Sequence, residues 1–197
     1  MRVIAGAAKG RRLAVPDGRD VRPTADRVKE ALFSSLQPLL GGAAVLDLYA
    51  GSGGLGLEAR SRGAGDVVLV EADRRVLSVL ADNVATVGLD HVEVLATRVP
   101  EGLARLDGRR FDLVLADPPY RLADDEVDSL LAEVTPLLAD EAVVVVERGV
   151  RSRPPRWPDG FTDVTARRYG EVVLHRARWV GTPRATTVPA DPSQEVT

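Results

Sequence analysis

Residues 45–56 read Val-Leu-Asp-Leu-Tyr-Ala-Gly-Ser-Gly-Gly-Leu-Gly, which places a glycine-rich turn directly after a short apolar strand. Gly51, Gly53 and Gly56 match the pattern G-x-G-x-x-G, typical of loops that approach a nucleotide closely. About 20 residues after Gly51, Glu71 ends the next apolar run, where a carboxylate can accept both hydroxyl protons of a ribose. The stretch therefore predicts a nucleoside cofactor, bound through these residues: Tyr49, Ala50, Gly51, Ser52, Gly53, Glu71 and Ala72.

Apolar runs alternate with helical patterns on both sides of this loop, and together they predict a doubly wound α/β fold. The runs are nearly continuous in Val, Leu and Ala, as expected for a mostly parallel sheet that is buried on both faces. The expected strands are residues 43–48, 66–71, 91–95, 111–116 and 141–147. The expected helices are residues 55–62, 74–87, 124–138 and a short one at 100–106.

The two ends of the chain follow other patterns. At the front, residues 2–5 and 12–15 predict a small β-ribbon, and Thr24 is a candidate N-cap for a helix over 25–36. At the back, residues 161–168 and 171–179 predict a hairpin. We expect three parts: a ribbon and helix over 1–40, a catalytic domain over 41–180, and a disordered tail over 181–197.

The identity of the cofactor depends on Asp47, near the end of the first strand. A carboxylate there disfavours a pyrophosphate and favours the cationic sulfonium and amino groups of S-adenosylmethionine. An NAD-dependent oxidoreductase is the rival interpretation of the glycine pattern alone.

A second motif, Asp117-Pro118-Pro119-Tyr120, ends the strand predicted at 111–116. The prolines fix the turn and leave carbonyl acceptors at the carboxyl edge of the sheet, where open α/β sheets bind ligands. The Asp117 carboxylate, also a candidate cofactor contact, and the Pro118 carbonyl can hold both N–H bonds of a planar exocyclic amine. Tyr120 can stack on the base. The four residues are therefore the candidate catalytic turn of an amine methyltransferase.

Composition narrows the class of partner. The 197 residues hold 29 acidic and 26 basic side chains, a net charge of −3. That charge divides into +4 over 1–30, −10 over 31–150 and +3 over 151–197. An anionic partner that contacts the ends fits this asymmetry. We expect RNA contacts from basic residues of these end segments: Lys9, Arg11, Arg12, Arg22, Arg27 and Arg168, with Thr24 beside them.

Other classes of protein are disfavoured. The chain has no cysteine and two histidines, which excludes disulfides and zinc–thiolate sites and predicts no metal centre. Its apolar runs are far shorter than the roughly 20 residues needed to cross a bilayer. We expect a cytoplasmic protein without a membrane anchor.

With Arg2–Gly6, Lys9–Arg11 and Arg22–Phe33, the glycine loop and the Asp-Pro-Pro-Tyr turn resemble the RsmD-type family of class I methyltransferases. The resemblance implies a monomer with a seven-stranded sheet that methylates N2 of a guanine in 16S ribosomal RNA, within the small subunit or its assembly intermediate. It also implies that residues 22–24 lie near the cofactor and the incoming base. Where related enzymes offer Asp or Asn to the adenine, this chain has Thr97 and Arg98, and either could substitute.

Two further alternatives stay open on the sequence. N6-adenine methylation of DNA or RNA uses nearly the same catalytic turn. A non-catalytic RNA-binding factor of ribosome assembly would share the basic ends but would not need Asp117.

Overall fold

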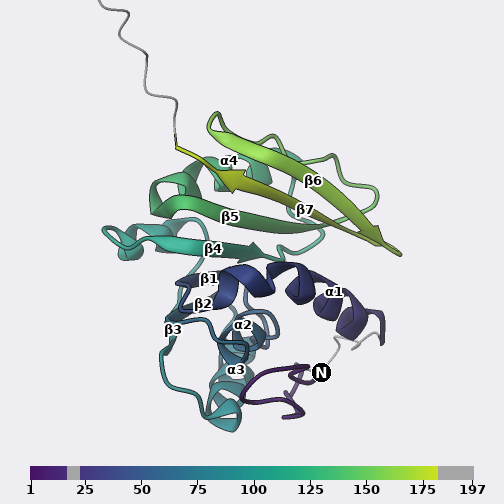
Figure 1. The fold of residues 1–197 in the computed structure, drawn as a ribbon, viewed down its shortest axis with the longest axis vertical. Helices are drawn as coiled ribbons and strands as arrows, with labels where there is room; N and C mark the ends of the chain where they lie inside the picture. The colour runs from purple at the N-terminus through teal and green to yellow at the C-terminus, as the bar shows by residue number, and fades with distance from the viewer. Residues whose placement is uncertain (17–22, 182–197) are drawn as a thin grey trace, which may run out of the picture.

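The computed structural model describes residues 1–16 and 23–181, and its centre is one seven-stranded sheet with the order β3-β2-β1-β4-β5-β7-β6 (Figure 1). The first five strands are parallel, while β7 is antiparallel to both β5 and β6. The bounds are β1 Val45–Leu48, β2 Val67–Glu71, β3 Val92–Ala96, β4 Phe111–Ala116, β5 Leu138–Gly149, β6 Phe161–Tyr169 and β7 Val172–Trp179. The predicted α/β fold with a mostly parallel sheet is thus confirmed.

Helices cover the two faces of the sheet, and each face has its own hydrophobic cluster. One cluster packs α1, α2 and α3 on alternate strand residues such as Leu115 and Val145. The other packs η1 and α4 on the intervening residues, such as Val114 and Val144. The bounds are α1 Pro23–Leu40, α2 Gly56–Ser61, α3 Arg74–Val87, η1 Glu101–Leu106, α4 Asp124–Val134 and η2 Thr135–Leu137.

Three local predictions need correction. Helix α1 begins at Pro23, because proline suits the first helical position, so the expected N-cap Thr24 lies inside the first turn. The N-terminal ribbon is reduced to one antiparallel bridge between Arg2 and Arg12. Helix α4, predicted over 124–138, ends at Val134 because the chain continues as η2 and a longer β5. The short helix predicted at 100–106 is confirmed as the 3₁₀ helix η1.

The N-terminal arm, residues 1–16, is packed against α2 and α3. Buried Glu58 accepts hydrogen bonds from the amides of Ile4 at 2.7 Å and Ala5 at 3.1 Å. A Cβ atom on Gly6, whose φ is +85°, would lie 1.7 Å from the Ser61 carbonyl oxygen. Asn83 of α3 bonds both the amide and the carbonyl of Ala14. The arm is therefore fixed by directed contacts.

Candidate active site

The loop after β1 is folded tightly by backbone that favours glycine. Tyr49, Gly51 and Gly53 have φ values of 59°, 58° and 83°. A Cβ atom on Gly53 would lie 2.8 Å from side-chain atoms of Leu57 and Leu80, so only glycine fits there. Behind the loop, the side chain of buried Asn83 donates to the Ser52 carbonyl at 2.8 Å. The loop is thus held from inside the protein.

Glu71, at the end of β2, joins this loop to the neighbouring strand. One carboxylate oxygen accepts the Gly51 amide at 2.9 Å, and the other accepts the amides of Ala72 at 2.7 Å and Asp73 at 2.9 Å. The side chain is half-buried, and a carboxylate offers about four lone-pair sites, so after the three amides about one site remains for a ribose hydroxyl, on the oxygen that bonds Gly51. This orientation fits the nucleoside end of S-adenosylmethionine.

The sequence predicts that Asp47 contacts the cofactor directly, but in the structure its side chain is buried. It is 1% exposed, and its carboxylate accepts the Gly56 amide at 2.7 Å, at the start of α2. Burial, with smaller contributions from the nearby carboxylates of Asp117 and Glu71, raises the pKa of Asp47 to about 7, although the Gly56 hydrogen bond acts in the opposite direction. Asp47 therefore closes the loop onto α2, and a cationic ligand beside it would favour its ionised form.

The predicted adenine contacts follow β3. The Thr97 amide donates to the Glu71 carbonyl at 3.0 Å, and its side chain fills the space beside Gly102, where a Cβ atom would lie 2.0 Å from the Thr97 methyl group. Arg98 is exposed, and its carbonyl accepts the Gly102 amide at 2.8 Å. Both residues lie at the carboxyl edge next to Glu71, and their contact with a cofactor stays a prediction.

The catalytic turn comes directly after β4, beside the end of β1. The Asp117 amide lies 3.4 Å from the Leu48 carbonyl, and the Leu122 amide donates to the Pro119 carbonyl at 2.8 Å, which closes the turn. Asp117 and Pro119 are exposed, whereas Pro118 is buried. The side chain of Tyr120 is 65% exposed. The turn therefore presents a carboxylate and an aromatic ring at the edge where Glu71 also lies.

A hollow of about 340 Å³ adjoins the turn and can accommodate part of a substrate. Its lining comes from the catalytic turn, the end of β5 with the segment that follows, and the turn before β7: Tyr120, Gly149, Val150, Arg151, Ser152 and Glu171.

Two charged residues at the end of β5 were not predicted as site residues. Glu147 follows Val146, which pairs with Ala116, so it lies beside Asp117 in the sheet. Burial and then Asp117 raise the pKa of Glu147 to about 8. Buried Arg148 donates to the Leu122 carbonyl and to the Asp124 carboxylate, both at 2.9 Å, and so fixes the segment that follows the turn. The sequence signal that could have identified both residues is their charge directly after a continuous apolar strand.

The predicted RNA contacts are widely separated in the structure. The Ala7 amide donates to the Ser61 carbonyl and Arg11 donates to the Thr86 carbonyl, at the ends of α2 and α3. Helices that follow parallel strands end at the amino edge of the sheet, so the exposed side chains of Lys9, Arg11 and Arg12 are remote from Asp117.

The remaining predicted contacts lie on or beside α1 and on the hairpin. Helix α1 begins on the side of the molecule where β4 ends, and Arg27 is exposed in its second turn (Figure 1). Thr24 lies in the first turn of this helix, and Arg22 lies outside the described residues. Exposed Arg168 of β6 donates to the Gly170 carbonyl at 2.9 Å. Lys29, two residues after Arg27, is instead buried: it donates to the Arg2 carbonyl and lies 3.4 Å from the Glu58 carboxylate.

Within residues 1–16 and 23–181, no three His, Cys, Asp or Glu side chains are grouped so that they could hold a metal ion. The same part of the chain contains no helix that is both long and apolar enough to cross a membrane.

The glycine loop, Glu71 and the Asp-Pro-Pro-Tyr turn on this sheet define a class I methyltransferase whose cofactor is S-adenosylmethionine. The chain belongs to the family described as Conserved hypothetical protein 95, whose model matches residues 1–178.

Relatives of known name support this assignment. The chain is 42% identical over 162 residues to Ribosomal RNA small subunit methyltransferase D of Escherichia coli K12, covering 82% of this chain and 81% of the relative. The protein of the same name from Haemophilus influenzae is 37% identical over 167 residues, with coverages of 82% and 85%. A solved structure of the Escherichia coli protein yhhF superposes with a TM-score of 0.79 at 32% identity, over 92% of this chain and 99% of that chain.

Proposed function

We propose that this methyltransferase transfers a methyl group to the exocyclic N2 of a guanine in small-subunit (16S) ribosomal RNA. The observation that carries the proposal is the position of the Asp117–Tyr120 turn beside Glu71 and the glycine loop, at adjoining strand ends. Similarity to relatives named for small-subunit ribosomal RNA supports the substrate class. A ribosomal substrate also implies a cytoplasmic enzyme, and we expect it to act as a monomer.

The residues of the turn suit an amine whose lone pair is delocalised into a ring. The Asp117 carboxylate and the Pro118 carbonyl would accept the two N–H bonds of N2 and so favour pyramidal nitrogen. A hydrogen bond to a charged acceptor is worth about 1.5–3 kcal/mol. Bound S-adenosylmethionine supplies the electrophilic methyl group. Catalysis then depends mostly on positioning the amine, for which the closed turn and Arg148 provide a rigid support.

The target base must leave its stack to reach this edge of the sheet. Exposed Tyr120 would stack on the extruded base, a contact worth about 1–3 kcal/mol. The hollow between Tyr120 and Gly149 offers space for the base or its ribose. In this arrangement Arg27 of α1 would contact RNA near the site, whereas Lys9, Arg11 and Arg12 would contact it farther away.

The test is methylation of small ribosomal subunits from a strain that lacks the activity, and of the same RNA without protein, using labelled cofactor. Digestion and mass analysis are expected to give N2-methylguanine, mapped to one nucleotide. N6-methyladenine as the product would overturn the choice of base. Absence of any methyl transfer, with RNA binding intact, would favour a non-catalytic assembly factor.

A further inference from the structure

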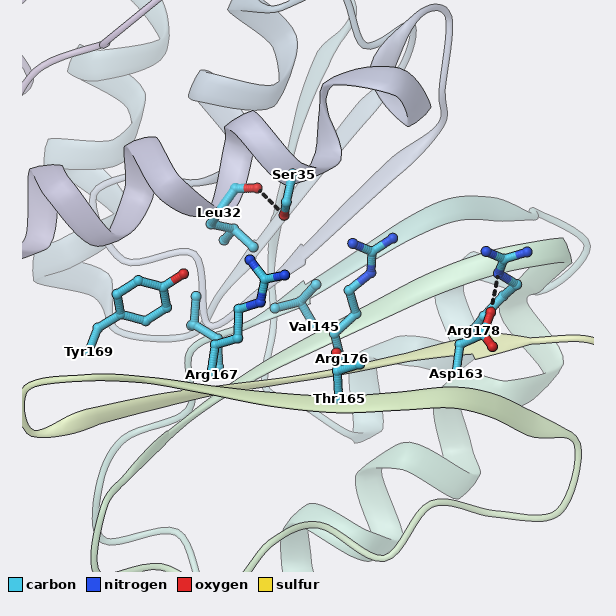
Figure 2. A pocket seen from close by; sticks show the side chains of 10 residues that line it. Leu32, Ser35, Val145, Asp163, Thr165, Arg167, Tyr169, Arg176 and Arg178 are labelled. Atoms are coloured by element: carbon cyan, nitrogen blue, oxygen red, sulfur yellow. Dashed lines mark hydrogen bonds and ion pairs between the residues drawn. The ribbon is translucent and has the colours of Figure 1, made fainter.

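A groove lined by three arginines lies between α1 and the β6–β7 hairpin. We call Arg167, Arg176 and Arg178, together with the space between them and α1, the arginine groove; its volume is about 170 Å³. Figure 2 shows the guanidinium groups of Arg167 and Arg176 directed towards α1, where Leu32 and Ser35 form the opposite wall. The groove is therefore a concave, basic surface at one end of the sheet.

Two of the three charges lack an acidic partner in the part of the chain that the structure describes. Arg178 forms ion pairs of 3.2 Å with Glu141 and Asp163. No ion pair joins Arg167 or Arg176 to any described acid. Burial, followed by the like charges of Arg178 and Arg167, lowers the pKa of Arg176, and Asp163, which also lines the groove, offsets this only in part. Arg176 is half-buried, whereas Arg167 and Arg178 are exposed. Like charges held close together favour an anionic ligand, because such a ligand relieves their repulsion.

The groove lies near the active edge of the sheet. Asp117 lies beside Glu147, Glu147 pairs with Leu174, and Leu174 pairs with Arg167. Three strand spacings of about 4.8 Å place Arg167 roughly 14 Å from Asp117. Arg176 lies diagonally across from Arg167, at about 7–8 Å, and so a chain of phosphates could contact both. An RNA strand whose target base lies at Asp117 could therefore reach the groove within a few nucleotides.

We infer that the arginine groove binds backbone phosphates of the RNA strand within a few nucleotides of the target base. Arg167 and Arg176 each hold one phosphate, and planar guanidinium groups suit bidentate contacts to phosphate oxygens. This inference rests on the proposed function. It assigns the hairpin's main contact to Arg167, on the α1 face of β6, because successive strand residues face opposite sides and Arg168 lies on the other face.

The first experiment measures binding of a short single-stranded RNA by fluorescence anisotropy over a range of KCl concentrations. Each lost phosphate contact should make the slope of log affinity against log salt about 0.7 less steep, so Arg167→Ala with Arg176→Ala should change it by about 1.4. Arg167→Lys with Arg176→Lys keeps the charges and should keep most of the slope. Arg110→Ala, an exposed residue before β4, removes one charge at the amino edge and should leave the slope unchanged.

Arg168→Ala tests whether RNA binds in the arginine groove or is attracted only by the positive charge of the β6–β7 hairpin. The inference expects a clearly smaller change of slope than Arg167→Ala produces. Equal changes for the two variants, or an unchanged slope in the double variant, would overturn the inference.

The second experiment measures methylation of small subunits by the full chain. The double alanine variant is expected to raise KM about tenfold, with kcat and S-adenosylhomocysteine affinity retained. If the wild-type protein methylates RNA but the double variant has the same KM, the inference about the arginine groove is wrong and the proposed function stands. If the wild-type protein methylates no RNA but the double variant still loses salt-dependent RNA binding, the proposed function is wrong and RNA binding in the arginine groove is supported.

Discussion

The buried carboxyl of Asp47 makes the stability of this protein depend on pH in a way that one substitution should remove. Its folded-state pKa of about 7 lies above the ordinary value of 3.8, so the folded chain holds a proton that the unfolded chain has already released. Stability contributed by this proton is present at low pH and is lost as pH rises through 7. The full loss is about 4 kcal/mol, at 1.36 kcal/mol per pKa unit, and about 2 kcal/mol of it falls between pH 5.5 and pH 8.

Asp47→Asn keeps an oxygen that can accept the Gly56 amide but carries no charge. The difference in unfolding free energy between variant and wild type should therefore shift by about 2 kcal/mol in favour of the variant between pH 5.5 and pH 8. Urea unfolding followed by tryptophan fluorescence at both pH values gives this difference. The matched control is Asp112→Asn, because Asp112 is exposed yet also accepts a backbone amide, from Ala44 at 2.8 Å. If wild type and Asp47→Asn change in parallel with pH, the burial argument is wrong.

Three further outcomes follow from the site and from the support of the N-terminal arm. Asp117→Ala should lower the rate of methyl transfer by about 10²-fold or more, while the affinity for S-adenosylhomocysteine, measured by calorimetry, stays near that of wild type. A near-normal rate in this variant would contradict the proposed chemistry. Glu71→Ala should weaken S-adenosylhomocysteine about 10-fold or more in the same calorimetry, since a charged acceptor is lost, and unchanged affinity would remove Glu71 from the cofactor site. Glu58→Ala should lower the free energy of unfolding, measured with urea, by about 3–5 kcal/mol, because it leaves Lys29 buried without its acidic partner. The control Glu93→Ala, which breaks an exposed ion pair with Arg109, should lower it by less than about 1 kcal/mol. Similar losses in the two variants would refute this account.

Much of the fold, and the grouping of residues at the candidate site, could be predicted from the sequence because their signals are local. Continuous apolar runs indicate strands buried on both faces, and parallel strands place the ends of β1, β2 and β4 at one edge. The glycine loop, Glu71 and the Asp117–Tyr120 turn therefore had to meet. Boundaries were less predictable, since the start of α1 and the end of α4 depend on how the chain enters the next element.

Other features depend on contacts between segments far apart in the chain. The N-terminal arm is fixed by Glu58 and Asn83, which are buried and accept hydrogen bonds from backbone amides of the arm. In the sequence nothing distinguishes these two residues from other polar helix residues. Glu147 becomes a neighbour of Asp117 only through the pairing of β4 with β5.

The sequence by itself determined the class of the protein, because the motifs for a nucleoside cofactor and an amine acceptor are contiguous and follow recognisable strands. The tertiary structure alone decided which charges are available to a substrate. Arg167 and Arg168 are adjacent and alike in sequence, but the register of the hairpin directs Arg167 into the groove and Arg168 to the other face of β6. Such a choice depends on the side of the sheet that α1 covers, and no local pattern encodes it.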